Sequence, residues 1–312
     1  MSLDCAIIGG GPAGLTAALY LARFRRNILV LDGEQSRAKW IPNTHNQAAF
    51  PGGISGAELL LRMGEQIRAH HIVPRAATVH EVRRTKNAFQ IKLDGQTLEA
   101  KTVLLATGVV NRRPAIDEEL HNEAVQRGII RYCPVCDGFE AIDQAIAVLG
   151  ASRHGASEAL FLRTYSADVT LLPEDRFELD VAERDKLAAA GVKIIEALAT
   201  SFTLSDRQIS VTIKGQERPC AFDTLYPALG SRANSSLAGR IGAAVSETGC
   251  LYTDQDQMTS IDGIYAAGDV VEGLDQIAVA SGHAAVAATA IHNRLRERER
   301  ATIGKLAISK GR

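Results

Sequence analysis

The sequence predicts an α/β protein that contains two similar modules, the second inserted into the first. At two places, residues 9–14 and residues 150–155, a glycine-rich turn follows an apolar strand and opens a helix. After each turn the chain continues with a second apolar strand and, further on, with a meander of short alternating strands. This order of elements, repeated once, predicts parallel sheets with helices on their faces.

The elements of the first module follow from hydrophobic periodicity. Residues 4–8 form an apolar strand, residues 12–25 carry apolar side chains at helical spacing, and residues 28–31 form a strand that ends at Asp32. This strand–helix–strand unit implies a parallel pairing. The remaining predicted elements are one helix, three meander strands and one buried strand, at 56–70, 78–82, 89–93, 97–99 and 103–106.

The same pattern restarts after residue 112. Its predicted elements are strands, a helix and a second meander, at 145–149, 155–163, 169–172, 199–211 and 222–229. The chain then returns to the first module, where an apolar run ends at residue 267 and an alanine-rich helix covers 276–298. We therefore expect a discontinuous first domain, residues 1–112 and 238–312, and a second domain, residues 113–237. Both are Rossmann-like, three-layer dinucleotide-binding modules.

Composition excludes several classes of function. The 312 residues are 46% hydrophobic and 23% charged, which is typical of a soluble globular protein. A net charge of −1 argues against nucleic acid or an anionic membrane as a partner. The chain shows neither a signal peptide nor an apolar run long enough to span a bilayer, so we expect it in the cytoplasm.

The first glycine-rich turn has the full pattern of a dinucleotide site. Gly9 allows a tight turn, Gly11 allows backbone N–H groups to approach a pyrophosphate, and Gly14 allows the helix to pack closely on the strand. Asp32 ends the next strand, where a carboxylate can accept hydrogen bonds from ribose hydroxyls. Two further pairs lie just beyond apolar strands and are expected at the same ligand: Thr107-Gly108 and Gly268-Asp269.

The second glycine-rich turn departs from this pattern. Ser152 replaces the middle glycine, and its side chain would crowd a pyrophosphate. Glu174 and Asp175 follow the next strand, where they would repel a ribose 2′-phosphate, so NADPH is disfavoured. Three arginines near this turn are either phosphate ligands or solvated surface residues: Arg153, Arg163 and Arg176.

Cys133 and Cys136 form a C-x-x-C pair with Asp137 directly behind it. This spacing allows a tight disulfide. In the reduced pair, one thiolate attacks a substrate disulfide and the other resolves the mixed disulfide. Asp137 is expected to move protons to and from a thiol, to cap a helix, or to do both. Because no second pair of cysteines or histidines completes a four-ligand set, no metal site is expected.

Together these residues resemble the low-molecular-weight thioredoxin reductases, a flavoprotein family. The resemblance covers nearly the whole chain and rests on four motifs, at 8–14, 106–108, 133–138 and 266–270. It implies FAD in the first module and a homodimer. It also implies that Cys136 faces the flavin, Cys133 exchanges with substrate and Asp137 is the acid. Further flavin contacts are implied for five residues: Pro12, Ala13, Asn46, Gln276 and Ile277.

The resemblance leaves the electron donor and the direction of electron flow open. We expect reduced flavin to pass an electron pair to the Cys133–Cys136 disulfide and on to a thioredoxin-like protein or a small disulfide. Because the NADPH pattern is altered, the use of NAD(P)H is doubtful and a ferredoxin-type donor is an alternative. The runner-up is a dithiol oxidase that passes electrons to oxygen. An NADP reductase and a non-enzymatic flavin-binding sensor fit less well, because neither needs the cysteine pair.

Overall fold

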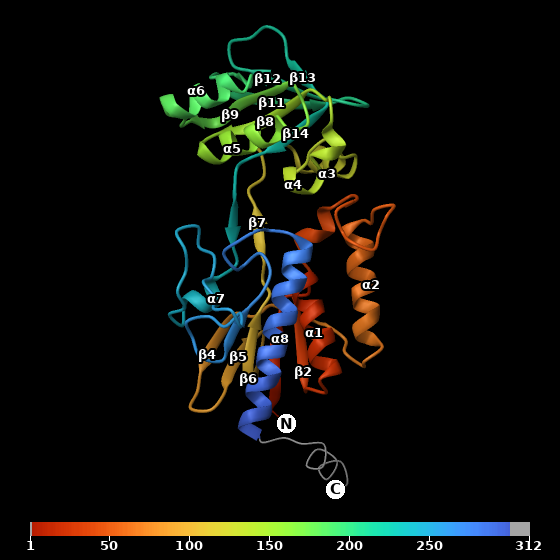
Figure 1. Cartoon of the computed structure of the whole chain (residues 1–312), viewed down its shortest axis with the longest axis vertical. Coiled ribbons are helices and arrows are strands. Elements are labelled where there is room, and N and C mark those ends of the chain that lie inside the picture. The colour runs from red at the N-terminus through yellow and green to blue at the C-terminus, as the bar shows by residue number, and fades with distance from the viewer. Residues whose placement is uncertain (1, 300–312) are drawn as a thin grey trace. The chain divides into compact units, whose positions relative to one another are not determined.

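The computed structural model describes residues 2–299 and shows an α/β protein, as predicted (Figure 1). The chain divides into two compact units. The first unit comprises Met1–Lys39, Ala57–Val110 and Arg232–Arg312, and the second comprises Trp40–Gly56 and Asn111–Ser231. The last part of the predicted first domain, residues 300–312, lies outside the described residues.

The units differ from the predicted domain boundaries mainly at Trp40–Gly56, which we expected in the first domain. The reason is packing, because Trp40 contacts the hydrophobic core of the second unit. Its ring lies beneath the Arg113 guanidinium at 4.3 Å and makes edge or tilted contacts with His121 and Tyr132. The chain also changes units at residues 110–111 and 231–232 rather than at 112–113 and 237–238.

The first unit contains one sheet, with the strand order β3-β2-β1-β6-β5-β4 and with β16 also paired to β6. The strands β1, β2, β3, β6 and β16 run parallel, whereas β4 and β5 are antiparallel. The seven strands are β1 Leu3–Ile8, β2 Ile28–Asp32, β3 Arg75–Ala76, β4 Glu81–Arg84, β5 Phe89–Leu93, β6 Gln96–Leu105 and β16 Ile264–Ala266.

Both faces of this sheet are covered. Alternate residues of β1 point to opposite sides, so that Cys5 and Ile7 belong to one core cluster and Ala6 and Ile8 to the other. The first cluster packs against α1 (Pro12–Arg23) and α8 (Ile277–Glu299), which lie side by side in Figure 1. The second cluster includes residues of the short helix α7 (Ser236–Gly239). Most of η1 (Arg37–Trp40) and of α2 (Gly56–Arg68) also belongs to this unit.

The second unit contains a parallel sheet, with the strand order β10-β9-β8-β14, and an antiparallel sheet, with the order β11-β12-β13. These strands are β8 Ile146–Ala151, β9 Val169–Phe177, β10 Lys193–Ile194, β11 Ala199–Leu204, β12 Ile209–Ile213, β13 Cys220–Phe222 and β14 Thr224–Pro227. The helices are α3 Glu118–Gln126, α4 Pro134–Asp137, η2 Phe139–Ala141, α5 Arg153–Leu162 and α6 Val181–Ala189. Two short strands, β7 (Val109–Asn111) and β15 (Ser231–Ala233), pair where the chain passes between the units.

Several predicted strands were wrong in extent. The runs 97–99 and 103–106 belong to one strand, β6, whose first half pairs with β5 and whose second half pairs with β1 and β16. The run 222–229 divides at Asp223, because β13 pairs in the antiparallel sheet and β14 in the parallel one. The run 169–172 continues to Phe177. None of the described helices is both long and apolar enough to cross a bilayer.

Candidate functional site

In the turn between β1 and α1, two glycines lie so close to backbone carbonyl groups that a side chain would clash with them. At Gly9, where φ is +118°, a Cβ atom would lie 2.1 Å from the carbonyl oxygen of Ala106. At Gly14 it would lie 1.9 Å from the carbonyl oxygen of Gly9. The first and third glycines of the motif therefore bring the helix and the strand together, as the sequence predicts.

The N-terminus of α1 is available to an anionic ligand. Gly11 is its N-cap and Pro12 its first residue, and no side chain within residues 2–299 caps the helix. The Asp32 carboxylate, at the end of β2, packs against Gly10, where a Cβ atom would lie 2.2 Å from its Oδ2. Backbone N–H groups, positive helix dipole and a ribose acceptor thus meet at one edge of the sheet, an arrangement that fits a dinucleotide such as FAD.

Thr107 and Gly268 lie at the same edge, two residues beyond the ends of β6 and β16. Thr107 Oγ1 donates to the carbonyl of Asn234 at 2.8 Å, and Asn234 Nδ2 donates to the carbonyl of Thr107 at 3.0 Å. A Cβ atom at Gly268 would lie 3.0 Å from the Cβ of Ala13, so this turn packs directly on the start of α1. The structure therefore brings together both strand-end motifs that the sequence predicted and adds Asn234 to them.

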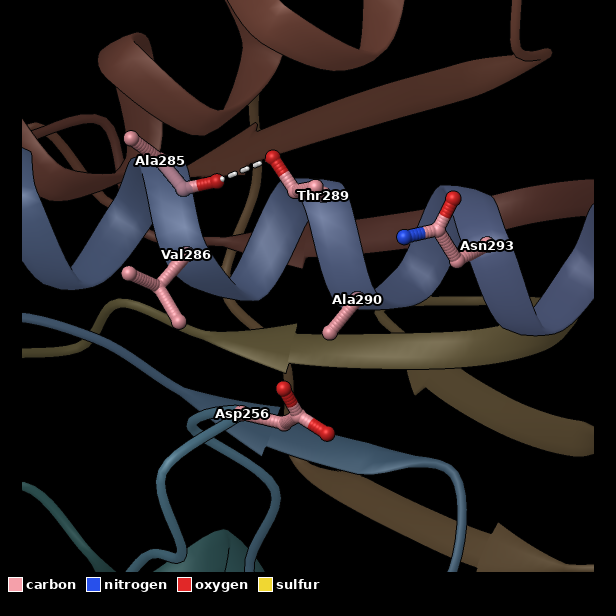
Figure 2. A pocket seen from close by; sticks show the side chains of 6 residues that line it. All are labelled: Asp256, Ala285, Val286, Thr289, Ala290 and Asn293. Carbon is pink, nitrogen blue, oxygen red and sulfur yellow. Dashed lines mark hydrogen bonds between the residues drawn. The ribbon is translucent and has the colours of Figure 1, made fainter.

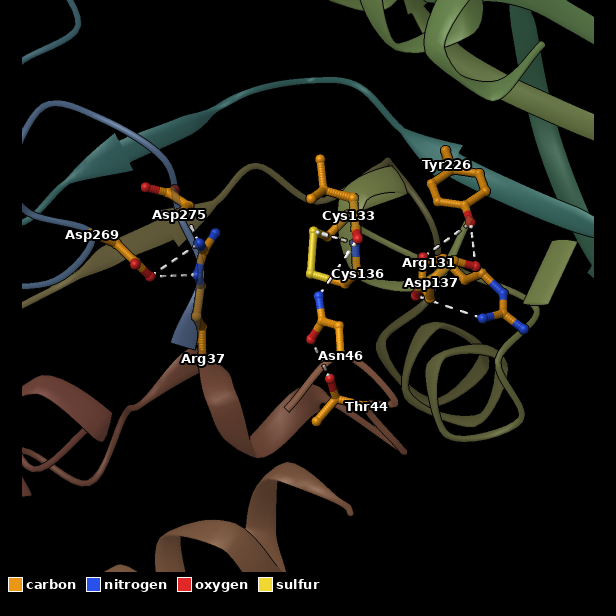
Figure 3. Close-up of a disulfide and its surroundings, with 11 residues drawn as sticks. Arg37, Thr44, Asn46, Arg131, Cys133, Cys136, Asp137, Tyr226, Asp269 and Asp275 are labelled. Atoms are coloured by element: carbon orange, nitrogen blue, oxygen red, sulfur yellow. Dashed lines mark hydrogen bonds and ion pairs between the residues drawn. A yellow bond between two sulfur atoms is a disulfide. The ribbon is translucent and has the colours of Figure 1, made fainter. Parts of the chain in front are cut away.

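Arg37 joins two carboxylates of the first unit (Figure 3). Its Nε donates to Asp269 Oδ2 at 3.0 Å, and its Nη2 donates to Asp275 Oδ2 at 2.9 Å. Burial and the charge of Asp269 raise the pKa of Asp275 to about 6, although Arg37 favours its ionised form. Gln276 and Ile277 follow directly, and α8 begins at Ile277. Arg37 thus holds the loop between Asp269 and α8, a contact that the sequence motif does not reveal.

Asn46 lies in the second unit. Its side-chain carbonyl accepts a hydrogen bond from Thr44 Oγ1 at 2.8 Å, and its Nδ2 donates to the carbonyl of Val135 at 3.5 Å. Val135 is the second residue between the two cysteines. Figure 3 shows Asn46 extending from its loop toward the cysteine pair. Within the second unit, Asn46 therefore contacts the C-x-x-C segment.

Cys133 and Cys136 form a disulfide with a Cα–Cα distance of 5.2 Å. Cys133 is the N-cap of α4, and its Sγ accepts a hydrogen bond from the Cys136 N–H at 3.1 Å. Pro134 is the first residue of this helix, where its missing N–H and fixed φ are favourable. The turn that the sequence predicts between the two cysteines is thus a single helical turn.

Asp137 lies behind the disulfide and accepts a hydrogen bond on Oδ1 from Tyr226 Oη at 2.9 Å (Figure 3). Arg131 Nη1 lies 3.6 Å from its Oδ2. Burial raises the pKa of Asp137 to about 6, while Arg131 and Tyr226 both favour the ionised form. Asp137 is the last residue of α4, so its side chain does not act as the N-cap of that helix. A carboxyl group with this pKa can both accept and release a proton near neutral pH.

The second glycine-rich turn keeps the backbone geometry of the first. A Cβ atom at Gly155 would lie 1.7 Å from the carbonyl oxygen of Gly150, which has a φ of +125°. However, Ser152 is the N-cap of α5, and its Oγ accepts a hydrogen bond from the Gly155 N–H at 3.4 Å. One of the N–H groups that a pyrophosphate would use is therefore engaged by the chain itself.

Strand β9 brings further groups to this second turn. Ala151 pairs with Phe177, and its carbonyl accepts a hydrogen bond from the Glu178 N–H at 2.8 Å. Glu174 is half-buried and accepts from the Ala115 N–H. Arg153, Arg163 and Arg176 each have an internal partner, namely Glu183, the Ala190 carbonyl and Glu178 respectively. In this structure the three arginines therefore serve contacts within the second unit.

A surface hollow of about 340 Å³ lies elsewhere, beside α8 (Figure 2). Its lining residues are Asp256, Ala285, Val286, Thr289, Ala290 and Asn293. Figure 2 shows Thr289 turned back along the helix, where its Oγ1 donates to the Ala285 carbonyl at 2.8 Å. No predicted site residue lines this hollow, so it is not part of the candidate site.

Four residues at the candidate site were missed by the sequence reasoning: Arg37, Arg131, Tyr226 and Asn234. Arg131 offered a signal, because it is a cation two residues before Cys133. Tyr226 offered none, because an aromatic residue within a buried strand is ordinary core. Its hydroxyl becomes informative only when its partner is known.

Comparison with known proteins assigns the chain to a family. Residues 3–284 match the family model "Pyridine nucleotide-disulphide oxidoreductase". A thioredoxin reductase from Ureaplasma parvum is 30% identical over 91% of this chain and 94% of its own length. A bifunctional thioredoxin reductase/thioredoxin from Mycobacterium leprae is 31% identical over 85% of this chain and 60% of its own.

A solved structure agrees with these relatives. The thioredoxin reductase of Streptococcus pyogenes superposes with a TM-score of 0.87 at 27% identity, over 95% of this chain and 99% of its own. Thioredoxin reductases use FAD, which fits the turn between β1 and α1. The chain therefore belongs to the pyridine nucleotide-disulphide oxidoreductase family, as a flavoprotein disulfide oxidoreductase of the low-molecular-weight thioredoxin reductase type.

Proposed function

We propose that this protein exchanges electrons between FAD and a disulfide or dithiol substrate through Cys133 and Cys136. The observation that carries the proposal is the Cys133–Cys136 disulfide with the largely buried carboxyl group of Asp137 behind it. In the reductive direction the substrate is a thioredoxin-like protein or a small disulfide. The name of the Mycobacterium leprae relative, which joins thioredoxin to the reductase, supports the first of these. We further propose that the enzyme acts as a homodimer.

In the exchange, the Cys133 thiolate attacks one sulfur of the substrate disulfide. A mixed disulfide forms and one substrate thiolate leaves. The Cys136 thiolate then attacks Cys133 Sγ, which restores the Cys133–Cys136 disulfide and releases the second substrate thiolate. Two electrons have then passed to the substrate. Asp137 is positioned to supply or accept the proton that accompanies each thiol step. Val135 and Phe139, both exposed beside the cysteines, support a protein surface as the partner.

We propose that FAD is held by residues at the carboxyl edge of the first sheet. Its pyrophosphate would lie against the turn formed by Gly9, Gly11, Pro12, Ala13 and Gly14, and a ribose would lie against Asp32. Further contacts are proposed for Asn46, Thr107, Gly108, Gly268, Asp269, Gln276 and Ile277. Bound FAD would supply two-electron exchange with the dithiol.

The second unit fits NADPH poorly. Ser152 engages the Gly155 N–H, Ala151 is paired with β9, and Glu174 stands where a 2′-phosphate would need a cation. The arginines that would be its ligands have partners within the chain. These contacts support a donor other than NADPH, such as a ferredoxin-type protein. They equally favour the second candidate function, a dithiol oxidase, in which the substrate dithiol itself supplies the electrons and oxygen accepts them.

Cysteine variants test the proposal. Cys133→Ser and Cys136→Ser should each abolish disulfide turnover, by at least about 100-fold, because neither can form the internal disulfide. FAD absorbance should remain in both variants, because the proposed flavin residues are unchanged. Cys220→Ser is the matched control, since Cys220 is a free cysteine of the same unit. Full activity of both variants would overturn the mechanism.

The electron donor is tested by anaerobic mixing of the flavoprotein with NADPH, NADH or dithiothreitol, followed by flavin absorbance. We expect dithiothreitol to bleach the flavin rapidly in the wild type and not in Cys133→Ser, and NADPH to bleach it slowly. Rapid bleaching by NADPH would contradict the interpretation of the second turn. Oxygen uptake with dithiols then separates the oxidase from a reductase that uses another donor.

A further inference from the structure

Two residues outside the C-x-x-C-Asp motif hold the carboxylate of Asp137 from different sides (Figure 3). Tyr226 belongs to β14, and Arg131 precedes the motif by two residues. We propose that Tyr226 and Arg131 are positioning residues that orient the Asp137 carboxylate and adjust its proton exchange with the Cys133–Cys136 pair. This inference rests on the proposed function, because it requires Asp137 to be the proton partner of the cysteines.

The fold places both residues rigidly. Tyr226 is fully buried and pairs with Val148 in the parallel ladder between β14 and β8. The preceding residue, Leu225, forms a bridge with Ile130 and accepts a hydrogen bond from the Arg131 N–H at 3.0 Å. One short backbone pairing therefore fixes Arg131 and Tyr226 together. Their positions do not depend on flexible surface side chains.

The Tyr226 hydroxyl has two acceptors in reach, both on Asp137. Its Oη lies 2.9 Å from Oδ1 and 3.2 Å from the backbone carbonyl oxygen. A hydroxyl has one proton, so it can donate to only one of them at a time. When the carboxylate is ionised, Tyr226 donates to Oδ1. When the carboxyl group is protonated, it can donate to Tyr226 Oη while Tyr226 donates to the carbonyl. Both protonation states of Asp137 are thus satisfied without any backbone movement.

Arg131 is the cation beside this carboxylate, and its positive charge lowers the pKa of Asp137. Its Nη1 lies 3.6 Å from Oδ2, and its buried Nε has no hydrogen-bond partner within residues 2–299. Two further titratable groups lie close by. Glu140, on η2, disfavours the charge on Asp137, and His45, on the 40–56 segment, lies 3.9 Å from Glu140 Oε1. Burial and Glu140 therefore oppose ionisation, and Arg131 and Tyr226 support it.

The test measures the titration of Asp137 by infrared difference spectroscopy of the oxidised protein, with Asp137→Asn as the baseline. Tyr226→Phe removes one hydrogen bond to the charged form, so the pKa should rise by about 0.5–1 unit. Arg131→Gln should raise it by about one unit or more, and Arg131→Lys should restore part of the difference. The pH profile of dithiol-driven flavin reduction should move to higher pH by the same amounts.

Tyr132→Phe is the matched control, because the Tyr132 hydroxyl contacts His121 at 2.6 Å instead of Asp137. An unchanged Asp137 titration in both Tyr226→Phe and Arg131→Gln would overturn the inference. The proposed role of Asp137 as the proton partner of the cysteines fails in a different way, namely if Asp137→Asn exchanges disulfides at the wild-type rate. Loss of exchange in Asp137→Asn, together with an unchanged titration in both Tyr226→Phe and Arg131→Gln, would overturn the inference and leave the proposed function intact.

Discussion

At the scale of residues, Asp137 combines a carboxyl group that is largely buried, with one fifth of its side chain exposed, with one cation and one hydroxyl. Burial is the largest effect on its pKa and outweighs Arg131 and Tyr226 together, so the pKa lies at about 6 instead of 3.8. Such a group favours the proton in the folded state more than in the unfolded state. Burial of the ionised Asp137 carboxylate therefore lowers the free energy of unfolding at neutral pH. It also gives a carboxyl group that titrates near neutrality, as is common at functional sites.

This cost predicts a pH-dependent effect of Asp137→Asn. Because the folded pKa is raised, the folded wild type binds more protons than the unfolded chain between pH 4 and 6, and its stability falls as pH rises through that window. The variant lacks this dependence. The free energy of unfolding of Asp137→Asn minus that of the wild type should therefore increase by up to about 3 kcal/mol as the pH is raised from 4 to 7. Thermal melts of both oxidised proteins at several pH values measure this. A difference that is independent of pH would contradict the raised pKa.

At the scale of elements, the two strand–turn–helix motifs, β1–α1 and β8–α5, share one backbone geometry. They differ at the residue that caps the helix. Gly9 and Gly150 have nearly the same φ, +118° and +125°, and Gly14 and Gly155 allow the same close approach of helix to strand. The difference is that Gly11 leaves the helix N-terminus free for a ligand, whereas Ser152 caps it. The same local backbone geometry therefore carries two different N-terminal caps, and we propose that the first turn is the ligand site.

Gly14→Ala tests the ligand role of the first turn. The added methyl group would lie 1.9 Å from the Gly9 carbonyl oxygen, so α1 must move away from β1. We expect FAD affinity to fall by at least about tenfold, since a turn displaced by about an ångström can no longer cradle the pyrophosphate. Dissociation of FAD, followed by flavin fluorescence, measures the effect.

Gly64→Ala is the control for the glycine variant. Gly64 lies in α2, and the atoms nearest to its added methyl group are those of the Arg68 guanidinium, at 3.4 Å or more. Because alanine favours a helix over glycine, the variant should keep its FAD and gain about 0.5–1 kcal/mol of stability. Equal FAD affinity in the two variants would show that the β1–α1 turn does not hold the cofactor.

At the scale of the whole molecule, the chain forms two compact units that are each assembled from separate segments. The second unit takes in Trp40–Gly56, far from its other residues in sequence. Trp40 is the only tryptophan of the chain. Its position against Arg113, His121 and Tyr132 makes it a spectroscopic reporter of this unit.

Trp40 emission should consequently follow the unfolding of the second unit, while release of FAD follows the first. Trp40→Ala should destabilise the second unit by about 2 kcal/mol, because it removes a partly buried ring and a cation–π contact. Trp40→Phe keeps a ring there and should lose less. Far-ultraviolet circular dichroism and FAD release during a denaturant titration separate the two units. If Trp40→Ala left the second unit as stable as the wild type, the assignment of this segment would be wrong.

Much of the fold and of the candidate site could be predicted because the signals are local. Helix and strand periodicity, the glycine turns and the spacing of Cys133 and Cys136 are properties of neighbouring residues. Strand limits were less predictable, since pairing decides them. For example, β9 continues past Pro173 because Phe177 finds a partner in Ala151, and the chain breaks at Asp223 because its flanking strands enter different sheets.

By itself, the sequence determined the α/β class, the flavoprotein family, the cysteine pair and the altered second turn, all of which depend on residues close together in the chain. Only the tertiary structure decided what surrounds Asp137. Tyr226 is 89 residues away in sequence, and it reaches the carboxylate because β14 lies beside the segment that carries Arg131. Proton affinity in a protein depends on burial and on neighbours in space, and no local pattern in the sequence encodes either.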